Sequence, residues 1–506
     1  MGLFGTGARR ICAVVAARTA AKMAVQLRAA LRETSTVELR LDWLRSDAER
    51  SRLLRWLKRT KPRGTTFLAT CRRLPGGGQL AGDVQDELHW LRQARQAGCQ
   101  WCDLEIETLR ELPEKSSRDL GLPPRVLLSA HDFRRTPPLG RLLNSLARRD
   151  ADAVKIAANA QTIADSLQLL RAARHSKTIV TVPMGDVGLP ARILALREGS
   201  ALAYAPVAAA TAPGQISLFD LKHLYRAHKL TRRTEIYGVI GDPIGHSLSP
   251  LLHNTGFVAR KVDAVYLPFL VHELRDFLRA IPELGIRGFS VTLPHKQSIL
   301  RHLADCEPLA AEIGAVNTVV VRRDASLYGC NTDYVGVLRA LQKKLRLAGS
   351  RVLIFGAGGS ARAAAFALAR AGAVVSICAR RERAAKELAR AVGGEVLPRR
   401  ALRTRFFDAI LNSTPVGMHP QAAISPLKPR ELNCRIVMDL IYRPQRTQLL
   451  RLAAQKGIAT VSGAEMFLAQ GIAQWEIWTE QRAPETPMRA AVLNALRSEE
   501  KSRSRP

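Results

Sequence analysis

The sequence predicts an α/β protein in two halves, a (β/α)8 barrel followed by a second α/β half that ends in a dinucleotide-binding domain. Three observations support this prediction. The chain has 506 residues, which is enough for about three domains. Its first half alternates short apolar runs with segments able to form helices. A later apolar run, 351–355, leads through GAGGSA into an alanine-rich helix.

The barrel prediction depends on eight short apolar runs, each followed by a helical segment. Eight such units within about 230 residues match the size and period of a (β/α)8 barrel, and we assign residues 1–233 to it. Polar side chains stand at or just past the ends of several runs, where such barrels carry their chemistry. The runs cover residues 11–16, 37–42, 65–71, 101–106, 126–132, 153–158, 178–184 and 201–207.

The second half starts after a polar, basic stretch at 226–235, which we interpret as a linker. A new βα pattern begins at 236–242 and another at 351–368. We therefore expect a substrate-binding domain over 234–340, completed by about 468–495, and a dinucleotide-binding domain over 341–467.

Composition excludes several classes of protein. Hydrophobic residues make up 47% of the chain and charged residues 24%, as in average globular proteins and unlike disordered ones. No apolar run reaches the roughly 18–20 residues that a membrane-spanning helix needs. The net charge of +33 is spread evenly, with +18 over residues 1–233 and +15 over 234–506. This spread argues against a nucleic-acid-binding arm, although a nucleic-acid-associated protein remains the alternative from another class.

Cysteine usage and the N-terminus predict a cytoplasmic protein. Only eight cysteines occur, and the single C-x-x-C, Cys99 and Cys102, has no second ligand pair, so we expect no metal site. Arg18 and Lys22 interrupt any signal-peptide core. We therefore expect a reducing compartment and neither a membrane nor a nucleic-acid partner, and the oligomeric state stays open.

Two residues of the first half suggest imine chemistry. Lys155 lies in the apolar run AVKIAA, and apolar surroundings favour the free amine that attacks a ketone. His131 can move protons near neutral pH. Each residue taken alone could also be structural. Arginines at 40, 72 and 192 could each bind a carboxylate through two parallel hydrogen bonds. Together with Lys155 and His131, they suggest a small keto-acid substrate.

The first half resembles type I 3-dehydroquinate dehydratase, a TIM barrel, over essentially all of residues 10–230. The resemblance is carried by ELRLD, ATCR, DLE, SAHDF, VKIA, MGDVGLPAR and TAPGQ, which occur in family order. It implies that Lys155 forms the imine with 3-dehydroquinate and that His131 moves the protons. It also implies substrate-binding residues around them, namely Arg192, Gln215 and Thr211, with Glu38, Arg40 and Arg72 on the opposite wall.

One departure from that family concerns the group that supports the histidine. The family usually has Glu before the glycine pair that follows the arginine, whereas this chain has Gly76. We expect a slower or differently supported dehydratase, with Glu105 as a candidate helper. The alternative function is a monofunctional shikimate/quinate dehydrogenase that carries a weakened or inactive barrel.

A glycine-rich turn in the second half predicts a dinucleotide site. Glycines between a strand and a helix let backbone amides approach a pyrophosphate at the helix N-terminus. The next predicted strand ends in ARR, and Arg380 and Arg381 favour the 2′-phosphate of NADP over the ribose hydroxyls of NAD. The expected cradle comprises Gly356, Ala357, Gly358, Gly359, Ser360 and Ala361.

The remaining motifs of the second half resemble shikimate dehydrogenase over about 236–485. They are VIGDPIGHSLSPLLHN, GFSVTLPHK, IGAVNT, NTD, NSTPVGM, DLIYRP and GAEMFLAQ. The resemblance implies that Lys296 and Asp333 catalyse reduction of 3-dehydroshikimate to shikimate with NADPH. It implies further contacts for the substrate and the cofactor, namely Ser247, Ser249, Thr292, Asn317, Tyr442 and Gln470 for the substrate and Thr414 and Gly463 for the cofactor.

Two departures mark this half. Ser290 replaces the Asn common in single-domain bacterial enzymes, and Ala379 begins a cofactor motif that usually reads Asn-Arg-Thr. The order dehydratase then dehydrogenase resembles a bifunctional shikimate-pathway enzyme. We therefore expect consecutive dehydration and reduction by one chain.

Overall fold

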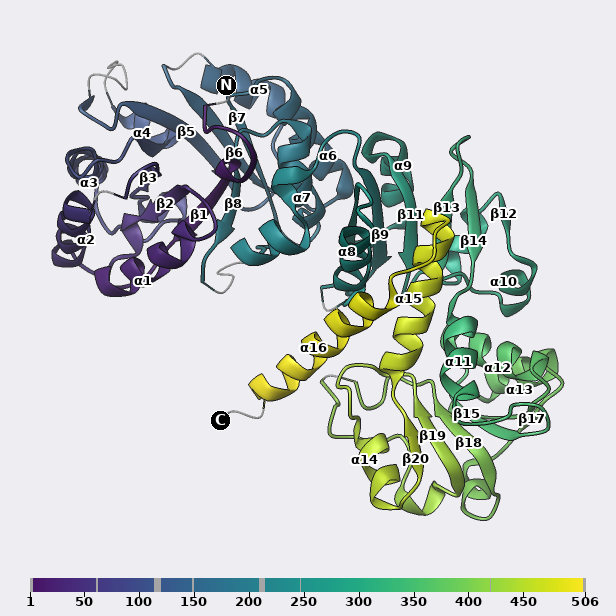
Figure 1. Cartoon of the computed structure of the whole chain (residues 1–506). Coiled ribbons are helices and arrows are strands. Elements are labelled where there is room, and N and C mark those ends of the chain that lie inside the picture. The colour runs from purple at the N-terminus through teal and green to yellow at the C-terminus, as the bar shows by residue number, and fades with distance from the viewer. Residues whose placement is uncertain are drawn as a thin grey trace. The chain divides into compact units, whose positions relative to one another are not determined.

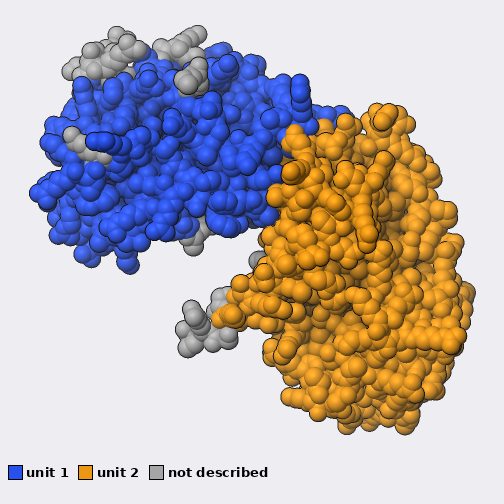
Figure 2. Space-filling view, viewed as in Figure 1, with its two compact units in different colours: residues 1–234, 268–283 blue, residues 235–267, 284–506 orange. Residues whose placement is uncertain are grey.

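The computed structural model describes residues 3–60, 62–112, 120–147, 150–208, 214–245, 247–418 and 420–503. Within these ranges, no helix combines the length and the apolar character required to cross a bilayer. The chain divides into two compact units, one comprising residues 1–234 and 268–283 and the other 235–267 and 284–506 (Figure 2). Each unit is described by itself.

The first unit contains the predicted barrel (Figure 1). Its sheet has eight parallel strands in the order β7-β6-β5-β4-β3-β2-β1-β8, so that each strand neighbours the next one in the chain. The Ala201 N–H donates to the Ile179 carbonyl at 2.8 Å just before β8 and links that end of the sheet to β7. The strands are β1 (Ile11–Val15), β2 (Thr36–Arg40), β3 (Thr66–Thr70), β4 (Trp101–Glu105), β5 (Arg125–Asp132), β6 (Ala153–Asn159), β7 (Ile179–Met184) and β8 (Ala203–Pro206).

Helices follow the first seven strands, and three of them begin at a side-chain cap. Thr19, Asp83 and Thr162 cap three of them by accepting a backbone N–H with their side chains, which satisfies donors that the helix leaves free. The helices are α1 (Ala20–Leu31), α2 (Asp47–Thr60), α3 (Val84–Gln96), α4 (Ile106–Glu111), α5 (Leu139–Ala147), α6 (Ile163–Arg174) and α7 (Leu189–Glu198). After β8, the described chain has a five-residue π-helix, Asp220–Leu224, where the alternation predicted a regular helix.

The barrel interior is apolar at one end and charged at the other. Phe4 packs on Trp101 with ring centroids 4.4 Å apart, next to buried Leu68 and Leu127. This apolar layer lies at the start of the strands, so the polar side chains occupy their carboxyl ends. That division places the chemistry where (β/α)8 barrels carry it.

The second unit begins with a mixed sheet in the order β10-β9-β11-β13-β14-β12. Its strands are β9 (Glu235–Gly241), β10 (Ala264–Leu270), β11 (Ile286–Val291), β12 (Asp305–Cys306), β13 (Thr318–Val321) and β14 (Leu327–Cys330). The accompanying helices are α8 (Ser249–Arg260), α10 (Pro308–Ile313) and α11 (Asp333–Gln342), whereas α9 (Leu274–Leu284), up to residue 283, and the last three residues of β10 are counted in the first unit. β13 runs antiparallel to both β11 and β14.

A second sheet of this unit is wholly parallel and has the order β17-β16-β15-β18-β19-β20. This is the doubly wound order of dinucleotide-binding folds, in which ligands bind where the strand order reverses. Its strands are β15 (Arg351–Phe355), β16 (Val374–Cys378), β17 (Glu395–Val396), β18 (Phe407–Asn412), β19 (Cys434–Asp439) and β20 (Ala459–Val461). Its helices are α12 (Gly359–Arg370), α13 (Glu382–Ala391) and α14 (Gln448–Gln455), followed by α15 (Gly463–Thr479) and α16 (Glu485–Arg503).

Two candidate active sites

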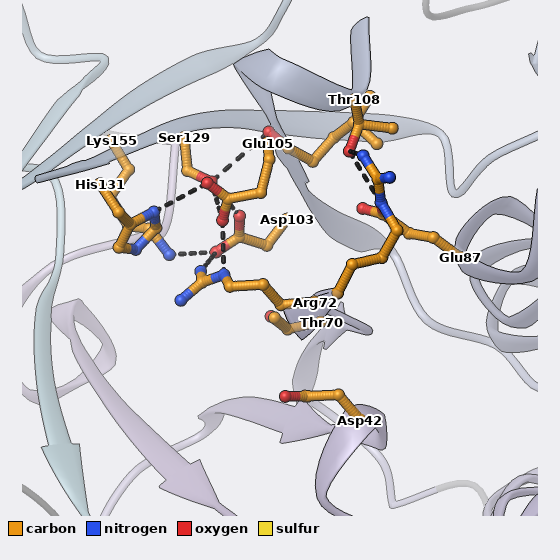
Figure 3. A network of polar contacts seen from close by, with 12 residues as sticks. Asp42, Thr70, Arg72, Glu87, Asp103, Glu105, Thr108, Ser129, His131 and Lys155 are labelled. Carbon is orange, nitrogen blue, oxygen red and sulfur yellow. Dashed lines mark hydrogen bonds and ion pairs between the residues drawn. The ribbon is translucent and has the colours of Figure 1, made fainter. Parts of the chain in front are cut away.

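The barrel site is built by strand register. In β4 and β5, Glu105 lies opposite Ser129, and Ser129 in turn lies opposite Lys155 of β6. His131 follows two residues after Ser129 and faces the same side of the sheet, because side chains alternate along a strand. Figure 3 shows these side chains converging at the ends of the strands.

Lys155 does not lie in the apolar environment that its sequence run suggested. Its ammonium forms an ion pair with Asp103, whose other oxygen accepts from the Ser129 hydroxyl at 2.5 Å. The Lys155 nitrogen also lies 5.0 Å from the centre of the Tyr204 ring. The apolar expectation was wrong because β4, two strands away from β6 in the sheet, contributes the Asp103 carboxylate. The run AVKIAA itself gives no sign of that residue.

Glu105 links the histidine to an arginine. One of its oxygens, Oε2, lies 2.9 Å from His131 Nδ1, and the other, Oε1, lies 2.5 Å from Arg72 Nε and 3.0 Å from the Ser129 hydroxyl. The side chains of Glu105, His131 and Arg72 are each 7% exposed. These three side chains therefore form a buried polar network in which Glu105 lies between the imidazole and the guanidinium.

Burial and charge set the protonation states of this network. Burial lowers the pKa of His131 to about 4; the charge of Arg72 lowers it further, whereas Glu105 raises it. Burial alone would raise the pKa of Asp103, but Lys155 and Arg72 hold it below its ordinary value. At neutral pH the site therefore contains a neutral imidazole and an ionised aspartate.

Two other predicted residues of the barrel, Glu38 and Arg40, each pair with another side chain. Glu38 accepts from Thr70 Oγ1 at 2.7 Å. Arg40 donates to both oxygens of Asp42, at 3.0 and 2.8 Å. Burial alone would lower the pKa of Arg40, but Asp42 raises it above its ordinary value.

Arg192 lies at 6% exposure, and its Nε donates to the Pro183 carbonyl at 3.1 Å. Burial lowers its pKa to about 10, and among the described residues no carboxylate pairs with it. A buried guanidinium without a carboxylate suits an anionic ligand. Gln215 is described and half-buried, whereas Thr211 lies outside the described residues.

Sequence reasoning did not name Asp103 and Ser129 as site residues. Both belong to quoted motifs, DLE and SAHDF, and both alternate with apolar residues on strands that end in the site. A polar residue at an inward-facing position near a strand end was the signal that could have identified them.

The second site centres on a lysine–aspartate pair. Lys296 Nζ lies 2.6 Å from Asp333 Oδ2, and the Asn317 amide donates to Asp333 Oδ1 at 2.8 Å. The same amide reaches Thr332 Oγ1 at 3.1 Å and Gln470 Oε1 at 3.4 Å. The structure thus brings together four of the residues predicted for this site, Lys296, Asp333, Asn317 and Gln470.

Four further predicted residues surround the first turn of α8 and the end of β11. The Ser247 hydroxyl accepts from the Ser249 N–H at 3.2 Å. Tyr442 interacts with the backbone of Leu248, between these serines, and stacks on Phe467 with ring centroids 4.6 Å apart. Thr292 is half-buried just after β11. Among the described residues, no hydrogen bond or ion pair joins these side chains to Lys296 or Asp333.

The glycine-rich turn lies at the reversal point of the parallel sheet. Gly356 follows β15 with φ +126°, and a Cβ there would collide with Ser413 after β18. A Cβ at Gly358, the residue before α12, would meet open space. The turn therefore leaves room for a pyrophosphate at the start of α12, as dinucleotide binding requires.

The same turn is close to the reductase pair, because the Cβ position of Gly359 lies 3.9 Å from Lys296 Cδ. Thr414 lies beside the turn, where its backbone N–H and its hydroxyl both donate to Asn412 Oδ1, at 3.0 and 2.7 Å. Gly463 packs closely on the backbone of Ile441. Arg380 and Arg381 are exposed just after β16.

No group of three or more His, Cys, Asp or Glu side chains is arranged to hold a metal ion in the parts of the chain that the structure describes.

Comparison with known proteins matches both halves. The type I 3-dehydroquinase family matches residues 11–232, the shikimate dehydrogenase substrate-binding domain matches 239–319, and the shikimate 5′-dehydrogenase C-terminal domain matches 463–493. The NADP(+) shikimate dehydrogenase of Methanothermobacter thermautotrophicus is 40% identical over 282 residues, 53% of this chain and 99% of that protein. A shikimate 5-dehydrogenase structure from Thermus thermophilus, in complex with NADP(H) and shikimate, is 34% identical over 51% of this chain and 99% of that one, with a TM-score of 0.48.

A relative that carries both halves decides the family. The chloroplastic bifunctional 3-dehydroquinate dehydratase/shikimate dehydrogenase of Arabidopsis thaliana is 34% identical over 500 residues, 94% of this chain and 82% of that protein. With both halves matched in the same order, the chain belongs to the bifunctional 3-dehydroquinate dehydratase/shikimate dehydrogenase family.

Proposed function

We propose that the chain dehydrates 3-dehydroquinate to 3-dehydroshikimate in the barrel and reduces that product to shikimate with NADPH in the second unit. One observation carries the proposal: a single chain holds two different lysine–aspartate pairs. One pair, Lys155 and Asp103, lies in a barrel together with a histidine that Glu105 contacts. The other pair, Lys296 and Asp333, lies next to the start of the dinucleotide-binding helix, where Lys296 Cδ is 3.9 Å from the Cβ position of Gly359.

In the barrel, Lys155 acts as the nucleophile. Its ammonium first gives up a proton, and the resulting amine adds to the substrate ketone carbon; the ketone oxygen then leaves as water with one proton returned to it and one from the lysine nitrogen, which produces a cationic imine. Asp103, next to the Lys155 nitrogen, stabilises that cation. Because the nitrogen remains positively charged, it withdraws electrons from the neighbouring carbon and makes its C–H bond acidic.

His131 performs the proton transfers. Its neutral imidazole removes the acidic proton, and the electron pair moves to the imine nitrogen as an enamine. The enamine electrons return to expel the hydroxyl group, which His131 protonates to water. Hydrolysis of the remaining imine releases the product and regenerates Lys155. Arg192, buried and without a carboxylate partner among the described residues, binds the substrate carboxylate.

In the second unit, Lys296 and Asp333 act at the substrate carbonyl. NADPH supplies the hydride when it is bound at the glycine-rich turn, and Arg380 and Arg381 hold its 2′-phosphate. The Lys296 ammonium donates a proton to the carbonyl oxygen, and Asp333 orients that ammonium through the 2.6 Å contact. Asn317, which donates to Asp333, keeps the carboxylate in place.

The remaining predicted residues complete the proposal. We assign 1–233 to the dehydratase, 234–340 with about 468–495 to substrate binding in the reductase, and 341–467 to NADP. The substrate-binding groups are Glu38, Arg40, Arg72, Thr211 and Gln215 in the barrel and Ser247, Ser249, Thr292, Tyr442 and Gln470 in the reductase. Thr414 and Gly463 border the cofactor.

A coupled assay tests the function. Protein, 3-dehydroquinate and NADPH are mixed, and loss of cofactor absorbance is followed; both activities together predict NADPH loss. A second assay starts from 3-dehydroshikimate. Loss of NADPH only in the second assay would refute the dehydratase and leave the alternative that Gly76 suggests, a monofunctional reductase with an inactive barrel.

We also propose a cytoplasmic location. All eight cysteines are free, and seven of them are buried, which suits a reducing compartment. Cell fractionation with a marker for each compartment tests this, and enrichment in an organelle, as in the name of the chloroplastic relative, would contradict it.

A further inference from the structure

We propose that Glu105 is the positioning residue of the dehydratase: it orients His131 and Arg72 at once, and Gly76 provides the space in which it does so. The proposal rests on the dehydration proposed above. Glu105 is not a catalytic residue in this scheme, because it acts on the substrate through the imidazole and the guanidinium.

The two oxygens of the Glu105 carboxylate face different partners. Oε2 faces the His131 ring nitrogen at 2.9 Å, and Oε1 faces Arg72 Nε at 2.5 Å. The Ser129 hydroxyl lies 3.0 Å from Oε1 and shares its one proton between this oxygen and the nearer Asp103 oxygen. Arg72 contacts Oε1 as an ion pair, since its Nε makes no hydrogen bond, so the negative charge and the acceptor capacity of an ionised carboxylate hold the cluster together.

The tautomer of the histidine depends on Glu105. Burial alone would raise the pKa of Glu105, but His131 and Arg72 lower it below its ordinary value. An ionised Glu105 only accepts hydrogen bonds, so His131 must carry its proton on Nδ1. Nε2 then keeps its lone pair and can take the substrate proton. The Phe133 ring, stacked on the imidazole with centroids 5.9 Å apart, holds its plane.

Several other charged groups lie near the His131 imidazole. Arg72, Lys155, Asp103 and Glu105 are the charged groups in this cluster. Asp103 is engaged by Lys155 and Ser129, which leaves Glu105 as the carboxylate in contact with His131 among the described residues.

Gly76 has a steric role in the same cluster. Its φ lies outside the left-handed region, so the backbone there does not require glycine. A Cβ at this position would lie 3.3 Å from Arg72 Cγ and 3.6 Å from Glu105 Cγ. An added methyl group would therefore be tight against the Arg72 side chain and in ordinary van der Waals contact with Glu105, so glycine leaves space beside the arginine.

The test is Glu105→Gln in the full-length protein. An amide has one acceptor oxygen, so it cannot accept from His131 and also face the Arg72 guanidinium with an oxygen. The always-charged guanidinium keeps the oxygen, and the amide N–H then faces Nδ1 and drives the proton to Nε2. A wrong tautomer behind a catalytic imidazole reduces turnover by up to about 10⁴-fold, and we expect a loss of about 10²- to 10⁴-fold in dehydratase kcat with KM changed less than about threefold.

Three controls separate positioning from misfolding. Shikimate dehydrogenase activity of the same variant should be unchanged, because Glu105 lies in the other unit. Borohydride trapping at Lys155 with 3-dehydroquinate should persist, since imine formation precedes the histidine step. Glu111→Gln removes an exposed carboxylate that pairs with Arg73 outside this cluster and should leave dehydratase kcat intact.

A direct readout does not depend on catalysis. With ¹⁵N-labelled histidine, the His131 signals, assigned through His131→Gln, should show Nδ1–H in the parent protein and Nε2–H in Glu105→Gln. If the parent protein fails to dehydrate but the tautomer shifts, the proposed function fails and the positioning role stands. An unchanged tautomer, a wild-type kcat, or loss of trapping in Glu105→Gln would overturn the positioning role.

The steric role of Gly76 has its own variant. Gly76→Ala should reduce dehydratase kcat by about three- to tenfold, as expected when a supporting contact is disturbed. Gly140→Ala adds a methyl group at an exposed position of α5 with open space around it and should have no effect. Equal rates for both variants would contradict the steric role.

Discussion

The two lysines proposed as catalytic each pair with an aspartate, yet their surroundings differ in kind. The Lys155 side chain is 5% exposed, and its partner Asp103 also faces Arg72 and Ser129. The Lys296 side chain is 16% exposed, and its partner Asp333 is held by the neutral amide of Asn317. One pair belongs to a charged network, and the other to a neutral one.

The difference follows the chemistry proposed for each site. A lysine that forms a covalent bond passes through charged intermediates, so a compensating carboxylate and a placed imidazole must already be in position before substrate arrives. A lysine that only donates a proton needs one carboxylate to orient it and neutral groups that do not compete for the hydrogen bond. Activity at the barrel site should therefore depend more on the residues around its lysine than activity at the Lys296–Asp333 site does.

Exchanging each lysine for an uncharged residue of similar length gives the largest expected effect. Lys155→Met should reduce dehydratase kcat by about 10³-fold or more, because the nucleophile is lost, and should leave reduction of 3-dehydroshikimate unchanged. Lys296→Met should do the reverse. Both activities are measured on each purified variant, and a loss of both activities from either substitution would break the assignment of one lysine to each reaction.

Removing each aspartate should distinguish the two networks by stability. Asp103→Ala leaves two buried cations without their carboxylate, which typically costs about 3–5 kcal/mol. Asp333→Ala uncovers a single, partly exposed lysine, and we expect a cost of about 1 kcal/mol. Urea unfolding followed by intrinsic fluorescence measures both. Equal losses would show that the charged surroundings of Asp103 do not matter for folding.

Acid should affect the dehydratase through its histidine. The base form of His131 is neutral, and its pKa is lowered to about 4, so dehydratase kcat/KM should stay level from pH 7 to about pH 5. Below pH 4 it should fall about tenfold per pH unit as the imidazole gains a proton. The profile is measured within the range where the protein remains folded by circular dichroism. A fall centred near pH 6.5, the ordinary value of histidine, would contradict the effect of burial.

The smallest effect is expected at the exposed arginines of the reductase. Arg380→Ala and Arg381→Ala should each raise KM for NADPH by about tenfold, or 1.4 kcal/mol, with little change in KM for NADH. Salt should weaken the difference, because exposed charges are screened. Arg383→Ala, an exposed neighbour that pairs with Glu387, is the matched control. An equal change toward NADH would show that these arginines do not recognise the 2′-phosphate.

Much of the fold was predictable from local patterns. The eight barrel strands lie within two residues of the predicted runs, because a buried parallel strand must be apolar for most of its length. The turn at 356–359 lies between β15 and α12 as predicted, because glycine next to an alanine-rich helix leaves few other structures. The last helix of the barrel differed: the described chain there forms a short π-helix, which no periodicity signals.

The sequence by itself determined the order of the elements, through apolar periodicity, and it predicted the two lysines and the histidine as site residues, through residue type and the quoted motifs. Only the tertiary structure decided the environment of Lys155, which an aspartate from β4 makes charged, and the partner of His131, which is Glu105. Those contacts join residues 52 and 26 positions apart in the chain. They depend on strand register, which is not encoded in the residues that surround each group along the chain.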